Sequence, residues 1–102
     1  MSTRADTIAP ILDAIPGSTA RKMFGEYGLY LEGKVIALIC DDTLFLKNLP
    51  AAAALLPGAA TGLPYPGAKP HLVADPWLDD PDTLAAAARA VADALPAPKP
   101  KT

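Results

Sequence analysis

The sequence predicts an α+β domain with two layers, in which N- and C-terminal helices pack on an antiparallel β-meander of about five strands. Two observations support this fold class. Within residues 21–47, side chains of similar character recur at every second position in short runs separated by turn residues, which is typical of strands. Residues 4–15 and 80–95 instead repeat apolar side chains at helical spacing. A chain of 102 residues is long enough for one such core.

The N-terminal helix is predicted over residues 4–15. Thr3 and Asp6 form a weak capping box at its start. Because Pro10 lacks the amide hydrogen that would bond to the carbonyl of Asp6, we expect the helix to kink there or to begin later. Its apolar face consists of Ile8, Ile11, Leu12 and Ile15.

A first strand is predicted over residues 19–24. Gly25 and Gly28 follow so closely that they indicate a bulge or a tight bend. The strand at residues 34–40 differs from the others, because apolar side chains occupy both of its faces. It is therefore expected at the centre of the sheet.

The turns and the leucines of the central stretch set the two faces of the sheet. Residues 32–33 (Glu-Gly) and 41–42 (Asp-Asp) tolerate the positive φ angles of tight hairpin turns. If leucine lines the face toward the helices, Tyr30 and Phe45 point to the opposite face. The leucines concerned are Leu29, Leu31, Leu44 and Leu46.

The second half of the chain contains two more helices. Pro50 begins a short Ala-rich helix at its first position. Residues 59–70, rich in Pro and Gly, form a loop, and residues 71–73 add one short strand at a sheet edge. Asp79 or Asp80 caps the last helix. Its apolar stripe consists of Leu84, Ala88, Val91 and Leu95.

The charge distribution argues against nucleic acid as a direct partner. Residues 1–95 form the domain, and residues 96–102 are expected to be a disordered basic tail of Pro and Lys. The formal net charge is -2, and residues 1–95 carry seven basic against eleven acidic groups. A surface of this kind repels phosphate, so we do not expect direct nucleic-acid binding.

The sequence predicts a cytoplasmic protein. Cys40 is the single cysteine, so an internal disulfide cannot form. The N-terminus lacks a charged region followed by an apolar core, and no apolar run approaches the length of a membrane span.

No set of residues in the sequence indicates a catalytic centre, a metal site or a cofactor site. His71 is the only histidine and has no second His or Cys to complete a ligand set. Cys40 precedes Asp41 and Asp42, whose charges raise a thiol pKa, which favours a structural thiol over a nucleophile. Asp41 and Asp42 could act as paired carboxylates, but solvated acids are ordinary in such turns. The sequence therefore favours a non-enzymatic protein.

Three segments of the chain resemble the N-terminal domain of the TfoX/Sxy proteins, which are named for regulators of bacterial competence. The segments are ARKMFGEYGLYLEGKVIALICDDTLFLK, LPYPGAKPHL and DDPDTLAAAARAV. The chain resembles the short members that consist of this single domain. The resemblance implies a two-layer α+β fold, frequent dimerisation and an association with transcriptional regulation, and it supplies no catalytic residues.

A pocket for a small ligand is one hypothesis for function. The loop YPGAKP holds a lysine between prolines, and rigid loops often carry binding residues. If the segment 65–71 folds over the segment 22–27, it encloses a site for an anion or a peptide, used by a binding protein or an enzyme. The alternative is a loop that only shields a sheet edge. The pocket would consist of Lys22, Tyr27, Tyr65, Lys69 and His71.

A protein-binding surface is the second and preferred hypothesis. Tyr30, Phe45 and one apolar set of the strand at residues 34–40 would face away from the helices. Exposed apolar patches usually mark contacts with other proteins. The interface residues are expected to be Tyr30, Ile36, Leu38 and Phe45. The preferred function is thus a regulatory or adaptor domain that acts through protein contacts, with a homodimer through the sheet face or edge as the first of them.

Overall fold

The computed structural model describes residues 4–23 and 26–96 and has the predicted α+β fold. All strands pair antiparallel in one six-stranded sheet. In chain order the elements are α1 (Ala5–Ala14), β1 (Ser18–Met23), β2 (Glu26–Leu31), β3 (Lys34–Cys40), β4 (Thr43–Leu46), α2 (Pro50–Leu55), β5 (Thr61–Gly62), β6 (His71–Val73), the 3-10 helix η1 (Asp75–Asp79) and α3 (Pro81–Ala94). The strand order is β1-β2-β3-β4-β6-β5.

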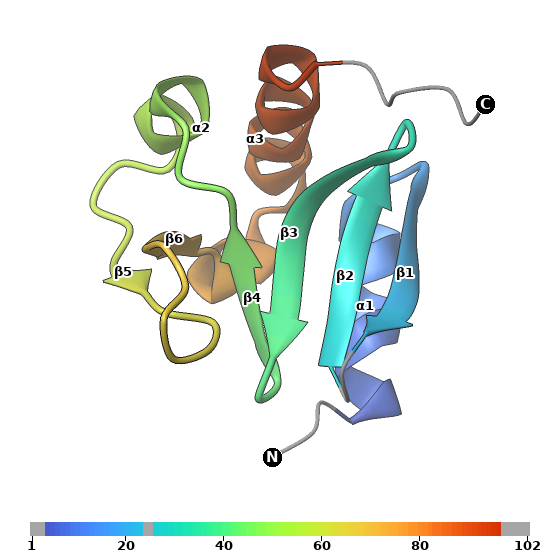
Figure 1. Cartoon of the computed structure of the whole chain (residues 1–102). Coiled ribbons are helices and arrows are strands. Elements are labelled where there is room, and N and C mark those ends of the chain that lie inside the picture. The colour runs from blue at the N-terminus through green and yellow to red at the C-terminus, as the bar shows by residue number, and fades with distance from the viewer. Residues whose placement is uncertain (1–3, 24–25, 97–102) are drawn as a thin grey trace, which may run out of the picture.

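The helices cover one face of the sheet. Figure 1 shows α1 and α3 behind the strands, with α2 beside α3. The leucines predicted to face the helices are buried. So are Ile8 and Ile11 of α1, Ile15 directly after it, and Leu84, Ala88 and Val91 of α3. These residues join one hydrophobic core between the two layers. Burial of this apolar area is the main force that holds helices to sheet.

Helix α1 begins at Ala5 and contains Pro10, so of the two expected effects of Pro10, a kink or a later start, the later start is wrong. Its N-terminus is capped by a distant residue. The backbone N–H of Arg4 and the hydroxyl of Thr7 both donate to Oδ1 of Asp42, over 2.8 and 2.7 Å. The predicted capping residue Thr3 lies outside the described residues. A carboxylate at this position also complements the positive end of the helix dipole.

Both predicted hairpin turns adopt the expected backbone. Glu32 and Gly33 have φ angles of 54° and 78°, and Asp41 and Asp42 have φ angles of 51° and 60°. Positive φ at both central residues gives the twist that a two-residue hairpin requires. Phe24 and Gly25, predicted to end the first strand and begin a bend, lie outside the described residues.

The alternation predicted for residues 34–40 fails at Ile36. The register between β2 and β3 shifts at Leu29 and Tyr30, since Leu29 pairs with Ala37 whereas Tyr30 pairs with Val35. The extra residue is Ile36, which is fully buried together with Ala37. Ile36 therefore belongs to the core and not to the outward face where it was predicted.

The predicted edge strand is not at the edge. β6 lies between β4 and β5, and the two-residue strand β5 forms that edge within the loop predicted at residues 59–70. Besides its pairing with β3 and β6, β4 forms hydrogen bonds with Ala74 and Asp75, which follow β6. The side chain of Asp75 accepts a hydrogen bond from the backbone N–H of Leu44 at 2.7 Å, and the N–H of Ala74 donates to the carbonyl of Leu44 at 3.0 Å. These bonds attach η1 to the sheet.

Helix α3 starts and ends on polar contacts. Asp80, one of the two predicted caps, accepts a hydrogen bond from the N–H of Thr83 at 3.5 Å. At the other end, Nζ of Lys34 donates to the carbonyl of Ala92 at 2.6 Å. A cation there stabilises the negative end of the helix dipole.

We expect Asp42→Ala to lower the melting temperature more than Asp41→Ala. Both substitutions place Ala at a positive φ, so the difference between them reports the cap on α1. The bonds from Arg4 and Thr7 lower the pKa of Asp42. The ionised carboxylate stabilises the folded state fully at pH values above the pKa of an unfolded Asp, about 3.9. This stabilisation is lost as the pH falls through the lower pKa of the folded state.

The pH dependence supplies the internal control for this cap. The difference between the two variants should be constant at neutral pH and shrink below roughly pH 4 in thermal melts followed by circular dichroism. Equal melting temperatures for the two variants at pH 7 would contradict the cap.

We expect Asp75→Ala to lower the free energy of unfolding by about 1–3 kcal/mol, because the fully buried Leu44 would lose the acceptor of its N–H. Urea denaturation measures the change. Asp79→Ala, at an exposed position in the same helix, is the matched control, and Asp75→Asn should recover most of the stability since its amide oxygen still accepts. Similar losses for Asp75→Ala and Asp79→Ala would exclude this role.

Candidate functional site

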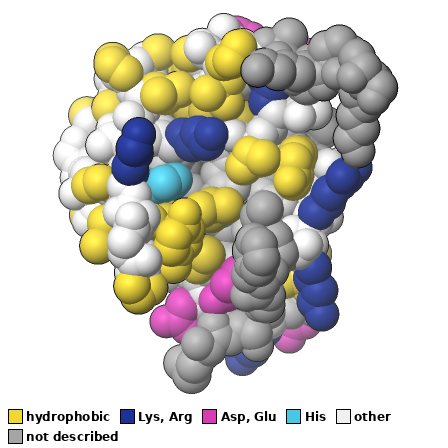
Figure 2. Space-filling view, viewed as in Figure 1, with side chains coloured by type: hydrophobic (Ala, Val, Ile, Leu, Met, Phe, Trp, Pro, Cys, Tyr) yellow, Lys and Arg dark blue, Asp and Glu magenta, His cyan; other side chains and the backbone are white. Residues whose placement is uncertain are grey.

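The face of the sheet opposite the helices carries a group of neighbouring, partly exposed apolar side chains, which we call the open face. Leu38 pairs with Phe45, and Phe45 pairs with Val73 on the next strand. Tyr30 pairs with Val35 at the other side of β3. Figure 2 looks onto this face and shows hydrophobic side chains gathered across it. The open face consists of Tyr30, Val35, Leu38, Phe45 and Val73.

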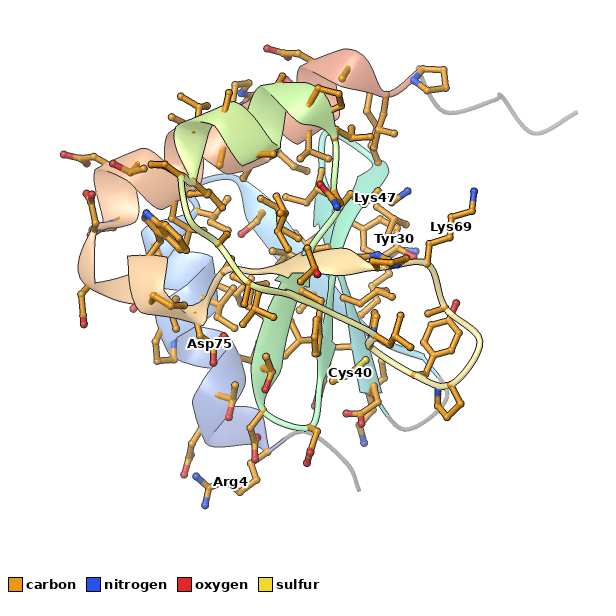
Figure 3. The ribbon with its side chains drawn as sticks, turned by 90° about the vertical axis from the view of Figure 1, so that its left-hand side faces the viewer. Arg4, Tyr30, Cys40, Lys47, Lys69 and Asp75 are labelled. Carbon is orange, nitrogen blue, oxygen red and sulfur yellow. The ribbon has the colours of Figure 1, made fainter. Side chains whose placement is uncertain are left out.

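The loop between β5 and β6 enlarges this surface. It lies on the same side of the sheet as the open face in both Figure 1 and Figure 3. Leu63 and Tyr65, both in this loop, are each 55% exposed. Large apolar side chains with such exposure beside an uncovered sheet are typical of contact surfaces.

Two contacts hold the aromatic rings of the open face in place. The guanidinium of Arg21 lies 5.4 Å from the centre of the Tyr30 ring, within the range of a cation–π interaction. A Cβ atom added to Gly62 would approach Cε1 of Phe45 to 3.2 Å, so the Phe45 ring packs closely on the bare backbone of β5. Both rings therefore have a packing partner within the chain.

The structure places three of the four predicted interface residues on this surface. Tyr30, Leu38 and Phe45 belong to the open face and are partly exposed, whereas Ile36 is fully buried. Whether these residues contact another protein stays a prediction.

The structure does not bring the predicted pocket together. Lys22 pairs with Tyr27 at the β1 end of the sheet, and Tyr27 packs against the hydrophobic core on the helix side. Tyr65, Lys69 and His71 lie at the opposite end, with β3 and β4 between β2 and β6. Neighbouring strands are about 4.8 Å apart, so roughly 14 Å separates β2 from β6. The described residues of the first segment, 22–23 and 26–27, therefore do not meet residues 65–71.

One basic residue that the sequence reasoning missed joins Lys69 and His71. Leu46 pairs with Leu72, and continuing this register by one step sets Lys47 opposite His71. Lys47 and Lys69 project on the side of the sheet away from the helices (Figure 3), and two basic side chains flank the histidine in Figure 2. We call Lys47, Lys69 and His71 the basic corner. Lys47 could have been found only from the pairing of β4 with β6, which places it beside His71.

The hydrogen bond of His71 determines its tautomer. Nδ1 lies 2.7 Å from the carbonyl oxygen of Lys69. A carbonyl only accepts, so Nδ1 carries the hydrogen and Nε2 is the acceptor of the neutral ring.

The other polar residues singled out in the sequence have structural partners. Asp42 caps α1, and the backbone N–H of Asp41 donates to Oε2 of Glu26 at 3.2 Å. Across residues 4–23 and 26–96, no three side chains of His, Cys, Asp or Glu gather closely enough to hold a metal ion. In the same residues no helix has the length and apolar composition that crossing a bilayer requires.

Cys40 is buried next to the turn at the end of β3. Burial raises the pKa of its thiol, and the negative charge of Glu26 raises it further. Both effects keep the thiol protonated at neutral pH and therefore a poor nucleophile.

The fold and the open face define the class of this protein: a small α+β domain whose helices cover one side of a single sheet. The chain belongs to the TfoX N-terminal domain family, whose model matches residues 10–95. It is similar to a relative from Spirochaeta aurantia named "Uncharacterized 12.7 kDa protein in trpE 5'region", with 39% identity over 104 residues, covering 99% of this chain and 90% of the relative. No solved structure matches the chain.

We expect Cys40 to react slowly with Ellman's reagent at pH 8 in the folded protein, because the thiol is buried and its pKa is raised. The absorbance of the released thiolate measures the rate. The same protein in urea is the control and should react much faster. Equal rates in the two states would show that the thiol is accessible and contradict this assignment.

Proposed function

We propose that this chain is a non-enzymatic regulatory or adaptor domain that acts by binding protein through its open face. The observation that supports this most is the group of neighbouring, partly exposed apolar side chains on a sheet face without helices. Apolar surface in such a position favours association with a complementary surface.

A second copy of the chain is the partner we propose first. The same patch on two copies is self-complementary about a two-fold axis, the commonest symmetry among protein dimers. The face is a better interface than the edge. Arg21 and Lys22 follow each other on the edge strand β1, and charged side chains on an edge oppose pairing with another strand.

The regulatory role we propose is in transcription and is indirect. Membership of the TfoX N-terminal domain family supports it. The net charge of -2 and the acids of the helix layer oppose contact with phosphate, so the domain would act on other proteins in the cytoplasm rather than on DNA. The acids of this layer include Asp79, Asp80, Asp82 and Asp93, all exposed, which a dimer through the open face would leave accessible.

We expect the wild-type domain to be dimeric at ~100 μM, a concentration that populates a dimer of micromolar affinity. Tyr30→Ala/Phe45→Ala should weaken the dimer at least about tenfold, since buried aromatic residues at the centre of interfaces each contribute more than ~1 kcal/mol. Light scattering coupled to size exclusion measures the mass.

The controls separate association from folding. Leu55→Ala removes an apolar side chain that is 40% exposed on α2, outside the open face, and should leave the dimer unchanged. Because the Phe45 ring packs on Gly62, a second variant, Tyr65→Ala, tests the surface at an exposed loop position. A wild-type monomer at this concentration, or a double variant that dimerises as well as Leu55→Ala, would overturn the proposed interface.

A further inference from the structure

The residues of the basic corner come from a part of the sequence that contains no acidic residues. Residues 43–74 hold Lys47, Lys69 and His71 but no Asp or Glu, in a chain whose total is eleven acidic residues. This segment forms β4, α2, β5 and β6 with their connections. Folding then places its three basic residues at one corner of the sheet.

No carboxylate of residues 4–23 and 26–96 forms an ion pair with the basic corner. Among the described residues, the ion pairs join Arg4 to Asp42 and Arg89 to Glu32, and neither includes a residue of the corner. Lys47 and Lys69 both lie beside His71, and positive charges that gather at one place repel each other. Binding of a negative group would relieve this repulsion.

The acidic counterpart lies at the other end of the sheet, on the strands β2 and β3. Glu26 starts β2, and Asp41 follows the end of β3, whereas Lys47 follows the end of β4 and His71 starts β6. The backbone bond from Asp41 to Glu26 holds the two acids close together. We call Glu26 and Asp41 the acidic end. One surface thus carries opposite charges at its two ends.

The apolar pair at the middle of this surface lies between the two charged groups. Cys40 pairs with Thr43 next to the acidic end, and Leu38 pairs with Phe45 two residues closer to the basic corner. A two-fold axis through this middle region exchanges the two ends of the surface. Leu38 and Phe45 of each copy would then meet their counterparts at the centre.

We infer that two copies associate through their open faces in an antiparallel orientation about a two-fold axis, which we call head to tail. The basic corner of each copy then lies on the acidic end of the other. This inference rests on the proposed function and adds the orientation of the partner and the residues that select it. A head-to-head arrangement would place Lys47 and Lys69 against the same residues of the second copy, which the repulsion of like charges disfavours.

Salt should weaken this dimer, because charges at the rim of an interface are screened by ions. Each contact between corner and acidic end occurs twice in a two-fold dimer. Exposed charge pairs contribute only modestly, so reversing the corner should raise the dissociation constant about tenfold.

The test uses two complementary variants of the full chain. The first, Lys47→Glu/Lys69→Glu, makes both ends of the open face acidic. The second, Glu26→Lys/Asp41→Asn, removes both acids so that neither end of the open face is acidic. Asn is chosen at position 41 because it tolerates the φ of 51° found there. Each variant alone should dimerise about tenfold more weakly than the wild type, and an equimolar mixture should form a heterodimer.

Sedimentation velocity measures the masses at 50 and 500 mM salt, and circular dichroism checks that each variant is folded. Lys22→Glu is the control for charge reversal outside the open face, since Lys22 lies on β1 in register with the inward-facing Tyr27. A heterodimer in the mixture, with weak association of each variant alone, is the expected result.

The failures of this inference and of the proposed function are distinguishable. A wild-type monomer would overturn the proposed self-association itself. A wild-type dimer that Tyr30→Ala/Phe45→Ala disrupts, but that the charge variants leave unchanged, would keep the open face as the interface and overturn the head-to-tail orientation.

Discussion

The structure depends on burial of one side of the sheet by a small number of short helices. Alternating leucines on β2 and β4 direct their side chains to α1 and α3, and this shared core holds the two layers together. The helices of so short a chain cover a single face, so the other face of the sheet remains at the surface. The open face is thus a consequence of how the apolar residues are divided between the two layers.

Polar contacts between distant residues define how the layers are placed on one another. Asp42 attaches the β3–β4 turn to the start of α1, Asp75 attaches η1 to β4, and Lys34 attaches the β2–β3 hairpin to the end of α3. Each carboxylate or ammonium group satisfies backbone groups that helix or strand ends leave without partners. Asp42, which the sequence left open as one of two paired carboxylates, therefore has a structural role.

The elements with strong periodicity could be predicted from the sequence, and those set by tertiary pairing could not. The leucines of β2 and β4 and the apolar stripe of α3 follow directly from their spacing. Ile36 could not be placed, because a bulge changes which side chains face the core. β5 has only two residues, too few to show alternation. Lys47 was missed as a neighbour of His71 because only the pairing of β4 with β6 relates them.

The cap on α1 has a consequence for synthesis of the chain. A helix of ten residues is only marginally stable in isolation, and this one also contains Pro10. Its first turn finds an acceptor on Asp42, 35 residues beyond Thr7. During translation, which proceeds from the N-terminus, this segment is made well before the turn that completes it. The N-terminal helix therefore acquires this cap only after the turn between β3 and β4 has left the ribosome.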